Sequence, residues 1–185
     1  MEIPLLILVT TQILLPLFFL MWLWLPRPAD RLGWAMRVVY GACYFAFITL
    51  VGRWDFISSA LAVVLPVVFI ALAMLSFTRV RDRPRNASAS VMRAHGLTAA
   101  MAVFFLALAT RALSGYGYQE TAVELAFPFA AGTYYIGQGG SATAINSHYA
   151  DQSQRYALDI VALNGFGARA RGLMPQDLTR YAIYG

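Results

Sequence analysis

The sequence has no lysine, one cysteine, two histidines and few charges of either sign. Charged residues occupy 12% of its 185 positions, about half the share that a soluble domain carries. Hydrophobic residues make up 59% of the chain, and the mean hydropathy is +0.60. This balance excludes a disordered tail, a coiled coil and an ordinary water-soluble enzyme. Cys43 has no second cysteine to pair with, so an intrachain disulfide is excluded as well.

The apolar residues gather in long runs, which is the distribution that a lipid bilayer selects. A helix rises about 1.5 Å per residue and the hydrocarbon core is about 30 Å thick, so a span needs roughly 20 residues. The runs are Ile3–Leu25, Leu32–Gly52, Phe56–Thr78 and Gly96–Leu113. The last is the weakest because Arg111 lies near its end, and a short re-entrant or interfacial helix is the alternative there. We therefore predict a four-span transmembrane region over residues 1–113.

Two local features refine this prediction. Pro16 lies in the middle of the first run, where a membrane helix tolerates it as a kink. Only Arg53, Trp54 and Asp55 separate the second run from the third. This spacing predicts a tight helical hairpin with Trp54 at a membrane interface.

Arginines are concentrated on two of the connections between the runs. They are Arg27, Arg31 and Arg37 around the first connection and Arg79, Arg81, Arg83, Arg85 and Arg93 in the third. The second connection holds only Arg53. The positive-inside rule therefore places the first and third connections in the cytoplasm and both termini outside it.

The same arginines bear on the possible partners. The segment from Arg79 to Arg85 lacks the interleaved aromatic side chains that stack on bases, so it favours anionic lipid headgroups over nucleic acid. We expect the lipid bilayer as a partner and no nucleic acid. The four runs contain no Asp or Glu, which disfavours a transporter or a proton pathway. His95, at the start of the fourth run, is most simply a headgroup-level residue.

The tail over residues 114–185 has the pattern of short β-strands. Thr133–Ile136 and Tyr156–Val161 are runs rich in β-branched and aromatic residues, each bounded by turn-forming residues. The glycines in Gly137–Ser141 follow the first run and lack the spacing of a phosphate-binding loop, so we predict a turn there. The tail is therefore predicted to be the start of a small β-rich extracytoplasmic domain.

Asp159 stands out within the second of these strands. A carboxylate inside an apolar strand costs several kcal/mol unless it is paired or bound to a metal. His148, in the preceding loop, is the imidazole that the chain can bring alongside, and His nitrogen with Asp oxygen is a known zinc-ligand pair. The alternative is a strand Asp that accepts hydrogen bonds from loop amides.

Several stretches of the tail carry a family resemblance when they are taken together. They are Gly132–Gly140, Ile145–Tyr149, Ser153–Val161, Gly172–Leu178 and Tyr181–Gly185. The region resembles the opening of the catalytic domain in membrane-anchored LytM/lysostaphin-type zinc metallopeptidases, and its most specific part is Gln154–Val161. The resemblance implies peptide-bond hydrolysis in peptidoglycan crossbridges, outside the bacterial cytoplasmic membrane.

The resemblance also implies a zinc ion, held by a His and an Asp of an early motif and by a His of a later His-x-His motif. Carried over to this sequence, Asp159 matches the early Asp, and Arg155 occupies the position of the early His. His148, which precedes Asp159 by eleven residues, is the nearest imidazole. We therefore take His148 and Asp159 as the candidate metal ligands.

No His-x-His motif occurs in the sequence, whereas a catalytic zinc site takes three protein ligands. We therefore expect these 185 residues to comprise a membrane anchor and the start of a catalytic domain, with no catalytic residue of their own and no activity alone. The alternative is a non-catalytic four-helix membrane protein whose tail is a binding or scaffold module.

Overall fold

The computed structural model describes residues 2–25, 28–85, 89–117, 124, 126–129 and 131–182. The chain divides into two compact units. The first, which we call the helical unit, comprises Glu2–Thr49 and Val63–Ala109. The second, the tail unit, comprises Leu50–Ala62 and Thr110–Gly185, so it includes a connection between helices as well as the tail itself.

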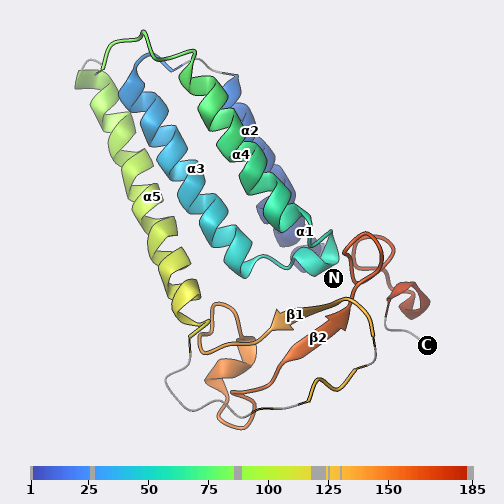
Figure 1. Ribbon diagram of the computed structural model, residues 1–185. Helices are drawn as coiled ribbons and strands as arrows, with labels where there is room; N and C mark the ends of the chain where they lie inside the picture. The colour runs from blue at the N-terminus through green and yellow to red at the C-terminus, as the bar shows by residue number, and fades with distance from the viewer. Residues whose placement is uncertain are drawn as a thin grey trace. The chain divides into compact units, whose positions relative to one another are not determined.

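The helices follow the apolar runs (Figure 1). They are α1 (Glu2–Val9), α2 (Leu15–Trp24), α3 (Arg31–Val51), α4 (Leu61–Phe77) and α5 (Ala89–Ser114). Within the described residues, three helical segments are long and apolar enough to cross a membrane: Pro4–Trp24, Arg31–Val51 and His95–Ser114. The fourth run, which the sequence marked as weakest, thus supplies one of these segments. The third run instead forms the shorter α4, with 17 residues.

α4 begins at Leu61 rather than at Phe56 because the preceding residues form other structure. Trp54–Phe56 is a short 3-10 turn, and the backbone N–H of Ser59 donates to Gly167 O at 2.8 Å, within the tail unit. The Trp54 side chain is only 1% exposed and packs inside the protein, and its expected position at a membrane interface stays a prediction.

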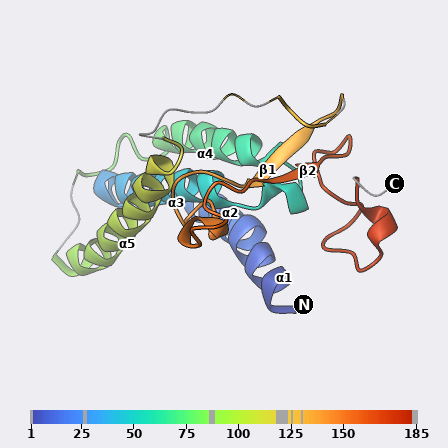
Figure 2. The ribbon, with the colours of Figure 1, turned by 90° about the horizontal axis from the view of Figure 1, so that it is seen from below.

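α3 is the central helix of the helical unit, and aromatic side chains pack it against its neighbours. The ring of Phe19 on α2 lies 4.8 Å from that of Tyr44 on α3, and Tyr44 lies 5.2 Å from Phe105 on α5. Phe45 on α3 lies 4.9 Å from Phe69 on α4. The view along the helices shows α3 between its partners (Figure 2).

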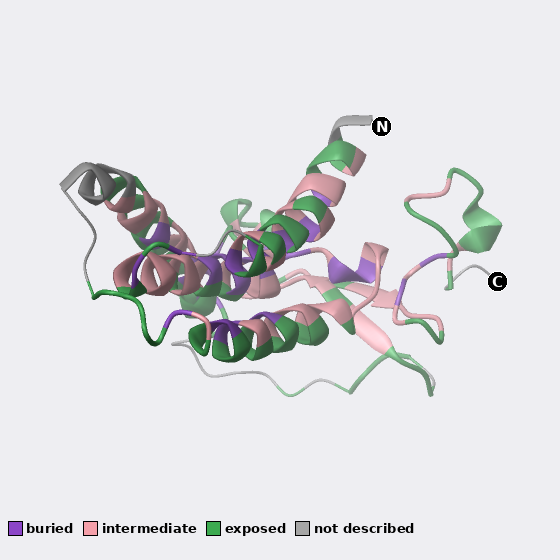
Figure 3. Cartoon of the chain, turned by 90° about the horizontal axis from the view of Figure 1, so that it is seen from above, coloured by how far each residue is buried: buried purple, intermediate pink, exposed green. Residues whose placement is uncertain are grey.

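The outer sides of these helices expose apolar side chains. At most 22% of the residues in the most apolar part of each long helix are buried, and buried positions lie on the sides that face other helices (Figure 3). In water such a surface would be costly, because exposed apolar area is unfavourable. The helices are therefore suited to associate with a membrane.

Pro16 is accommodated by a change of helical register. Thr10–Leu14 forms a π-helical turn between α1 and α2, and the Leu15 N–H donates to Thr10 O. Pro16 has no N–H to offer, so the Thr11 carbonyl lacks a main-chain donor from either residue. The Tyr44 hydroxyl on α3 donates to that carbonyl. The predicted irregularity at Pro16 is thus a π-helical turn whose freed carbonyl is satisfied by a neighbouring helix.

The tail unit contains a two-stranded antiparallel sheet of β1 (Tyr134–Gln138) and β2 (Asp159–Ala162). Tyr134 pairs with Ala162 and Gln138 with Asp159, with an irregularity between Ile136 and Gln138. Both predicted strands are confirmed, although each begins later than expected. The described part of the tail is otherwise turns and loops, including the 3-10 turns Ser147–Ala150 and Leu178–Arg180.

Candidate functional site

The turn that carries His148 is held by a buried asparagine. Asn146 is 1% exposed, and its Oδ1 accepts the His148 backbone N–H at 3.0 Å. Its Nδ2 donates to Gly140 O at 3.0 Å and to Arg155 O at 3.1 Å. Asn146 therefore ties the turn of His148 to the glycine turn after β1 and to the chain that leads into β2.

The structure brings the two predicted metal ligands together. His148 Nε2 lies 3.2 Å from Asp159 Oδ1, and His148 Nδ1 lies 3.1 Å from Gln154 Oε1. The expectation of a carboxylate inside an apolar strand is wrong: Asp159 is the first residue of β2, and its side chain is 48% exposed. Its partner in the structure is an imidazole rather than a loop amide.

Gln154 lies on the opposite side of the imidazole from Asp159, with its Oε1 3.1 Å from His148 Nδ1. The donor and acceptor roles of the two ring nitrogens depend on the tautomer. A neutral imidazole donates a hydrogen bond from one nitrogen, and a metal ion between Nε2 and Asp159 Oδ1 would instead take the lone pair of Nε2.

The separation of the two atoms suits a metal, but the number of ligands does not. Two ligands bound tetrahedrally to zinc at about 2.0–2.2 Å lie about 3.3 Å apart, close to the 3.2 Å between His148 Nε2 and Asp159 Oδ1. Among the residues that the structure describes, however, no three His, Cys, Asp or Glu side chains come together. A catalytic zinc site takes three protein ligands. These residues therefore do not fit a complete zinc site, because they supply two of its three protein ligands.

The nearest other carboxylate in the sequence is already engaged. Asp151 Oδ1 accepts the Ser153 hydroxyl at 2.7 Å and the Ser153 backbone N–H at 2.9 Å. These hydrogen bonds, with a smaller contribution from His148, lower the pKa of Asp151 below its ordinary value. Arg155, at the position of the family's usual His, lies over the ring of Tyr149 at 5.2 Å. Neither residue supplies a third ligand.

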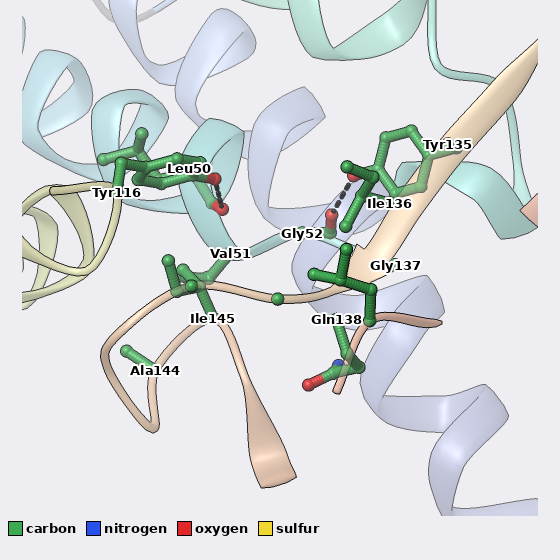
Figure 4. Close-up of a pocket in the computed structure, with 13 residues that line it drawn as sticks. Leu50, Val51, Gly52, Tyr116, Tyr135, Ile136, Gly137, Gln138, Ala144 and Ile145 are labelled. Carbon is green, nitrogen blue, oxygen red and sulfur yellow. Dashed lines mark hydrogen bonds between the residues drawn. The ribbon is translucent and has the colours of Figure 1, made fainter. Parts of the chain in front are cut away.

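The tail unit also contains a cavity of about 280 Å³, lined by residues of β1, of the glycine turn after it and of the chain that leads into β2 (Figure 4). The hydroxyls of Tyr116 and Tyr135 donate to Leu50 O at 3.0 Å and to Gly52 O at 3.2 Å on its wall. Burial raises the pKa of both tyrosines, so they remain donors at neutral pH. Gln138 also lines the cavity, and its Oε1 accepts the Ser147 N–H at 2.7 Å.

Gln138 is also the cross-strand partner of Asp159. His148 and Asp159 do not line the cavity; Leu158, which directly precedes Asp159, does. The wall is formed largely by the glycine-rich turn, Gly137–Gly140.

A buried cluster of charges, which was not predicted from the sequence, supports the tail unit. Asp55 is fully buried, with Oδ1 3.1 Å from Arg53 Nε and Oδ2 2.7 Å from Arg169 Nε. Both guanidinium groups lie over the ring of Phe56, at 5.0 and 4.4 Å. Burial lowers the pKa of Arg169, while the charge of Asp55 opposes that shift. The cluster fixes the connection before α4 to the end of the tail.

Gln154 and Asp55 are the residues that sequence reasoning missed. Gln154 lies within the segment of most specific resemblance, which was a signal that its side chain has a role there. Asp55 is an acidic residue between two apolar runs, a setting in which a carboxylate needs a cationic partner.

Comparisons of the chain with protein-family models, with curated proteins and with solved structures found no match.

Proposed function

We propose that this chain is a multi-span protein of the bacterial cytoplasmic membrane whose extracytoplasmic tail provides two ligands of a zinc metallopeptidase site of the LytM/lysostaphin type. The substrate class that this resemblance implies is the peptide crossbridge of peptidoglycan. One observation carries the proposal: His148 Nε2 and Asp159 Oδ1 lie 3.2 Å apart with Gln154 holding the other imidazole nitrogen. The role assigned to these residues is to bind a cation, and no step of hydrolysis is assigned to them.

The test is a titration of the full chain, in detergent micelles, with Zn²⁺ alone. The chain has two histidines, so its isotope-labelled imidazole groups give two sets of NMR signals, from His95 and His148. We expect Zn²⁺ to shift the His148 signals and not those of His95, and Asp159→Asn to abolish the shift. Gln154→Ala is expected to weaken binding by about 10–100-fold, because it removes the group that orients a metal-ligating His.

Asp177→Asn is the matched control, since Asp177 is an exposed tail carboxylate whose Oδ1 accepts from Thr179. It should bind Zn²⁺ as the parent chain does. A His148 signal that ignores Zn²⁺, or that responds equally in Asp159→Asn, contradicts the proposal. The contact would then be a hydrogen bond or an ion pair between the imidazole and the carboxylate.

Either of the two contradicting results favours the other candidate function, a non-catalytic membrane protein whose tail is a binding or scaffold module. The observation in its favour is the ligand count, because the described residues bring only two suitable side chains together. The cavity beside β1 would then be the binding site, and its occupancy would not depend on a metal.

Two sets of contacts support the proposed topology. Within the helical unit, Arg31 N–H donates to Pro84 O at 3.0 Å and Arg79 Nη1 donates to Trp24 O at 2.7 Å, so the first and third connections meet. Within the tail unit, the second connection packs with the tail, as Ser59 and Gly167 do. Connections that touch lie on one side of a bilayer. The positive-inside rule assigns the arginine-rich pair to the cytoplasm and the tail to the outside.

Cysteine labelling in intact cells tests this topology. In a Cys43→Ala background, Leu178→Cys should react with a membrane-impermeant maleimide, because Leu178 is 64% exposed on the tail. Arg83→Cys, on the exposed third connection, should react only after the membrane is permeabilised. The reverse pattern, or equal labelling of both positions in intact cells, would refute the proposed orientation.

A further inference from the structure

The loop after β2, residues 164–168, is a well-ordered element of the tail unit. Asn164 Oδ1 accepts the backbone N–H groups of Phe166 at 2.9 Å and Ala168 at 3.2 Å. Its Nδ2 donates to Ala170 O at 3.2 Å, and the Gly167 N–H donates to Asn164 O at 2.9 Å. These hydrogen bonds fix the conformation of the loop without any help from the side chain at its tip.

That tip is Phe166, whose side chain is 85% exposed, more than any other large hydrophobic residue in the described part of the chain. A phenylalanine in this position contributes little to packing within the tail unit. Exposure of this apolar ring to water is unfavourable in free energy. A rigid loop that presents one aromatic ring outward is typical of a surface that contacts an apolar partner.

The loop is hydrogen-bonded to the residues that directly precede α4 (Figure 1). The Ser58 hydroxyl donates to Phe166 O at 2.7 Å, and the Ser59 N–H donates to Gly167 O at 2.8 Å. Gly167 has φ +71°, and a Cβ there would lie 2.5 Å from Ser59 Oγ, so only glycine allows this close approach. Leu61, the first residue of α4, follows Ser59 by two positions.

The length of α4 bears on where Ser58 and Ser59 lie relative to a bilayer. Its 17 residues span about 25 Å, whereas the hydrocarbon core is about 30 Å thick. A short apolar helix draws its flanking residues towards the hydrocarbon boundary. Groups hydrogen-bonded to Ser58 and Ser59 are therefore drawn there as well, and an aromatic ring is favourable at that depth.

We propose that the loop of residues 164–168 is a membrane-surface anchor, with the Phe166 side chain inserted between the headgroups and acyl chains of the outer leaflet. The partner is the lipid bilayer itself. The anchor holds the loop after β2 against the membrane surface. The inference depends on α4 lying in the bilayer and not on zinc binding.

Environment-sensitive labels on the full chain test the anchor. In the Cys43→Ala background, Phe166→Cys and Leu178→Cys are labelled with NBD and the protein is reconstituted into phosphatidylcholine–phosphatidylglycerol vesicles. Leu178 is the matched control because it is a large, 64% exposed hydrophobic residue of the same unit. We expect blue-shifted emission at position 166, with loss of more than about half of its intensity to lipids that carry a nitroxide near the headgroup. The label at position 178 should behave as in water.

A third variant separates anchoring from a general effect on the fold. Adding Ser58→Ala removes the hydroxyl that holds Phe166 O and should reduce the quenching at position 166 without changing the label at position 178. Water-like emission at position 166 would overturn the proposal, as would equal quenching at both positions. Emission at position 166 that becomes apolar only when a peptide or protein is added would identify that molecule, rather than lipid, as the partner.

Discussion

Replacement of Asp55 by alanine is expected to lower the free energy of unfolding of the tail unit by about 3–5 kcal/mol. The carboxylate is fully buried and pairs with both Arg53 and Arg169. Its loss leaves two guanidinium groups together without a counter-charge. The lower part of this range is expected, because the Arg53 side chain keeps 30% of its surface exposed to solvent.

The substitution removes the carboxylate and keeps the backbone hydrogen bond of residue 55. The Asp55 carbonyl accepts the Arg169 N–H at 2.6 Å, and alanine keeps that acceptor. A second change, Arg169→Met in the Asp55→Ala background, removes one unpaired charge and retains an apolar side chain over Phe56. It should recover part of the lost stability, since well-packed apolar residues replace buried ion pairs at little cost.

Thermal unfolding and trypsin resistance of the full chain in nanodiscs measure the effect, with cleavage followed at the tail arginines. Asp82→Ala is the control, because Asp82 is 87% exposed and its contact with Arg81 is 3.5 Å long. That variant should unfold as the parent chain does. Asp55→Ala that resists trypsin as well as Asp82→Ala would show that the cluster is not needed for the tail to fold.

The sequence predicted those features that depend on local composition. The apolar runs placed the helices because twenty or so uncharged residues in a row have few alternatives to a membrane-suited helix. β-branched and aromatic runs placed both strands of the sheet. The start of α4 was misplaced because Ser58 and Ser59 bond to residues 166 and 167, more than a hundred positions away. Hydropathy carries no information about such a partner.

The charge cluster was missed for the same reason. Arg53 and Asp55 were interpreted as part of a short hairpin turn, and nothing in the sequence pattern drew attention to Arg169. What joins them is the packing of the second connection against the end of the tail, which brings Asp55 and Arg169 to 2.7 Å. An acidic residue between apolar runs is a signal that a cationic partner is needed, but sequence position alone does not identify which arginine supplies it.

The candidate metal pair was predicted only in part. The family resemblance, together with spacing, nominated His148 and Asp159, and the structure places their side chains in contact. The expectation that Asp159 is buried in a strand was wrong because the strand starts at this residue. Gln154, which contacts the imidazole, lies in the turn between the two candidate ligands, so the strand pattern carried no information about it.

Gly140→Ala is expected to destabilise the tail unit by about 3 kcal/mol or more. Gly140 has φ +103°, a conformation that alanine adopts only with strain. A Cβ would lie 2.6 Å from Ile145 Cδ1 and 2.7 Å from Gly115 O. The carbonyl cannot yield easily, because it accepts the Ser141 N–H at 2.7 Å.

The damage should extend to the candidate metal pair. Gly140 O accepts the Asn146 Nδ2, and Asn146 in turn holds the His148 backbone. A shifted Gly140 therefore loosens the turn that directs His148 towards Asp159. In the Zn²⁺ titration, Gly140→Ala should weaken or abolish the response of the His148 signals even at temperatures where the chain remains folded.

Gly165→Ala is the matched control, since a Cβ at Gly165 meets nothing within 4 Å and the residue is exposed. Its stability should stay within about 0.5 kcal/mol of the parent chain. Thermal unfolding in nanodiscs compares the two variants directly. Equal stability of Gly140→Ala and Gly165→Ala would mean that the turn after β1 relaxes freely, and the link from Gly140 through Asn146 to His148 would then lose its support. A destabilised Gly140→Ala beside an unchanged Gly165→Ala would instead establish that the glycine turn, rather than glycine content in the loops, holds the imidazole in place.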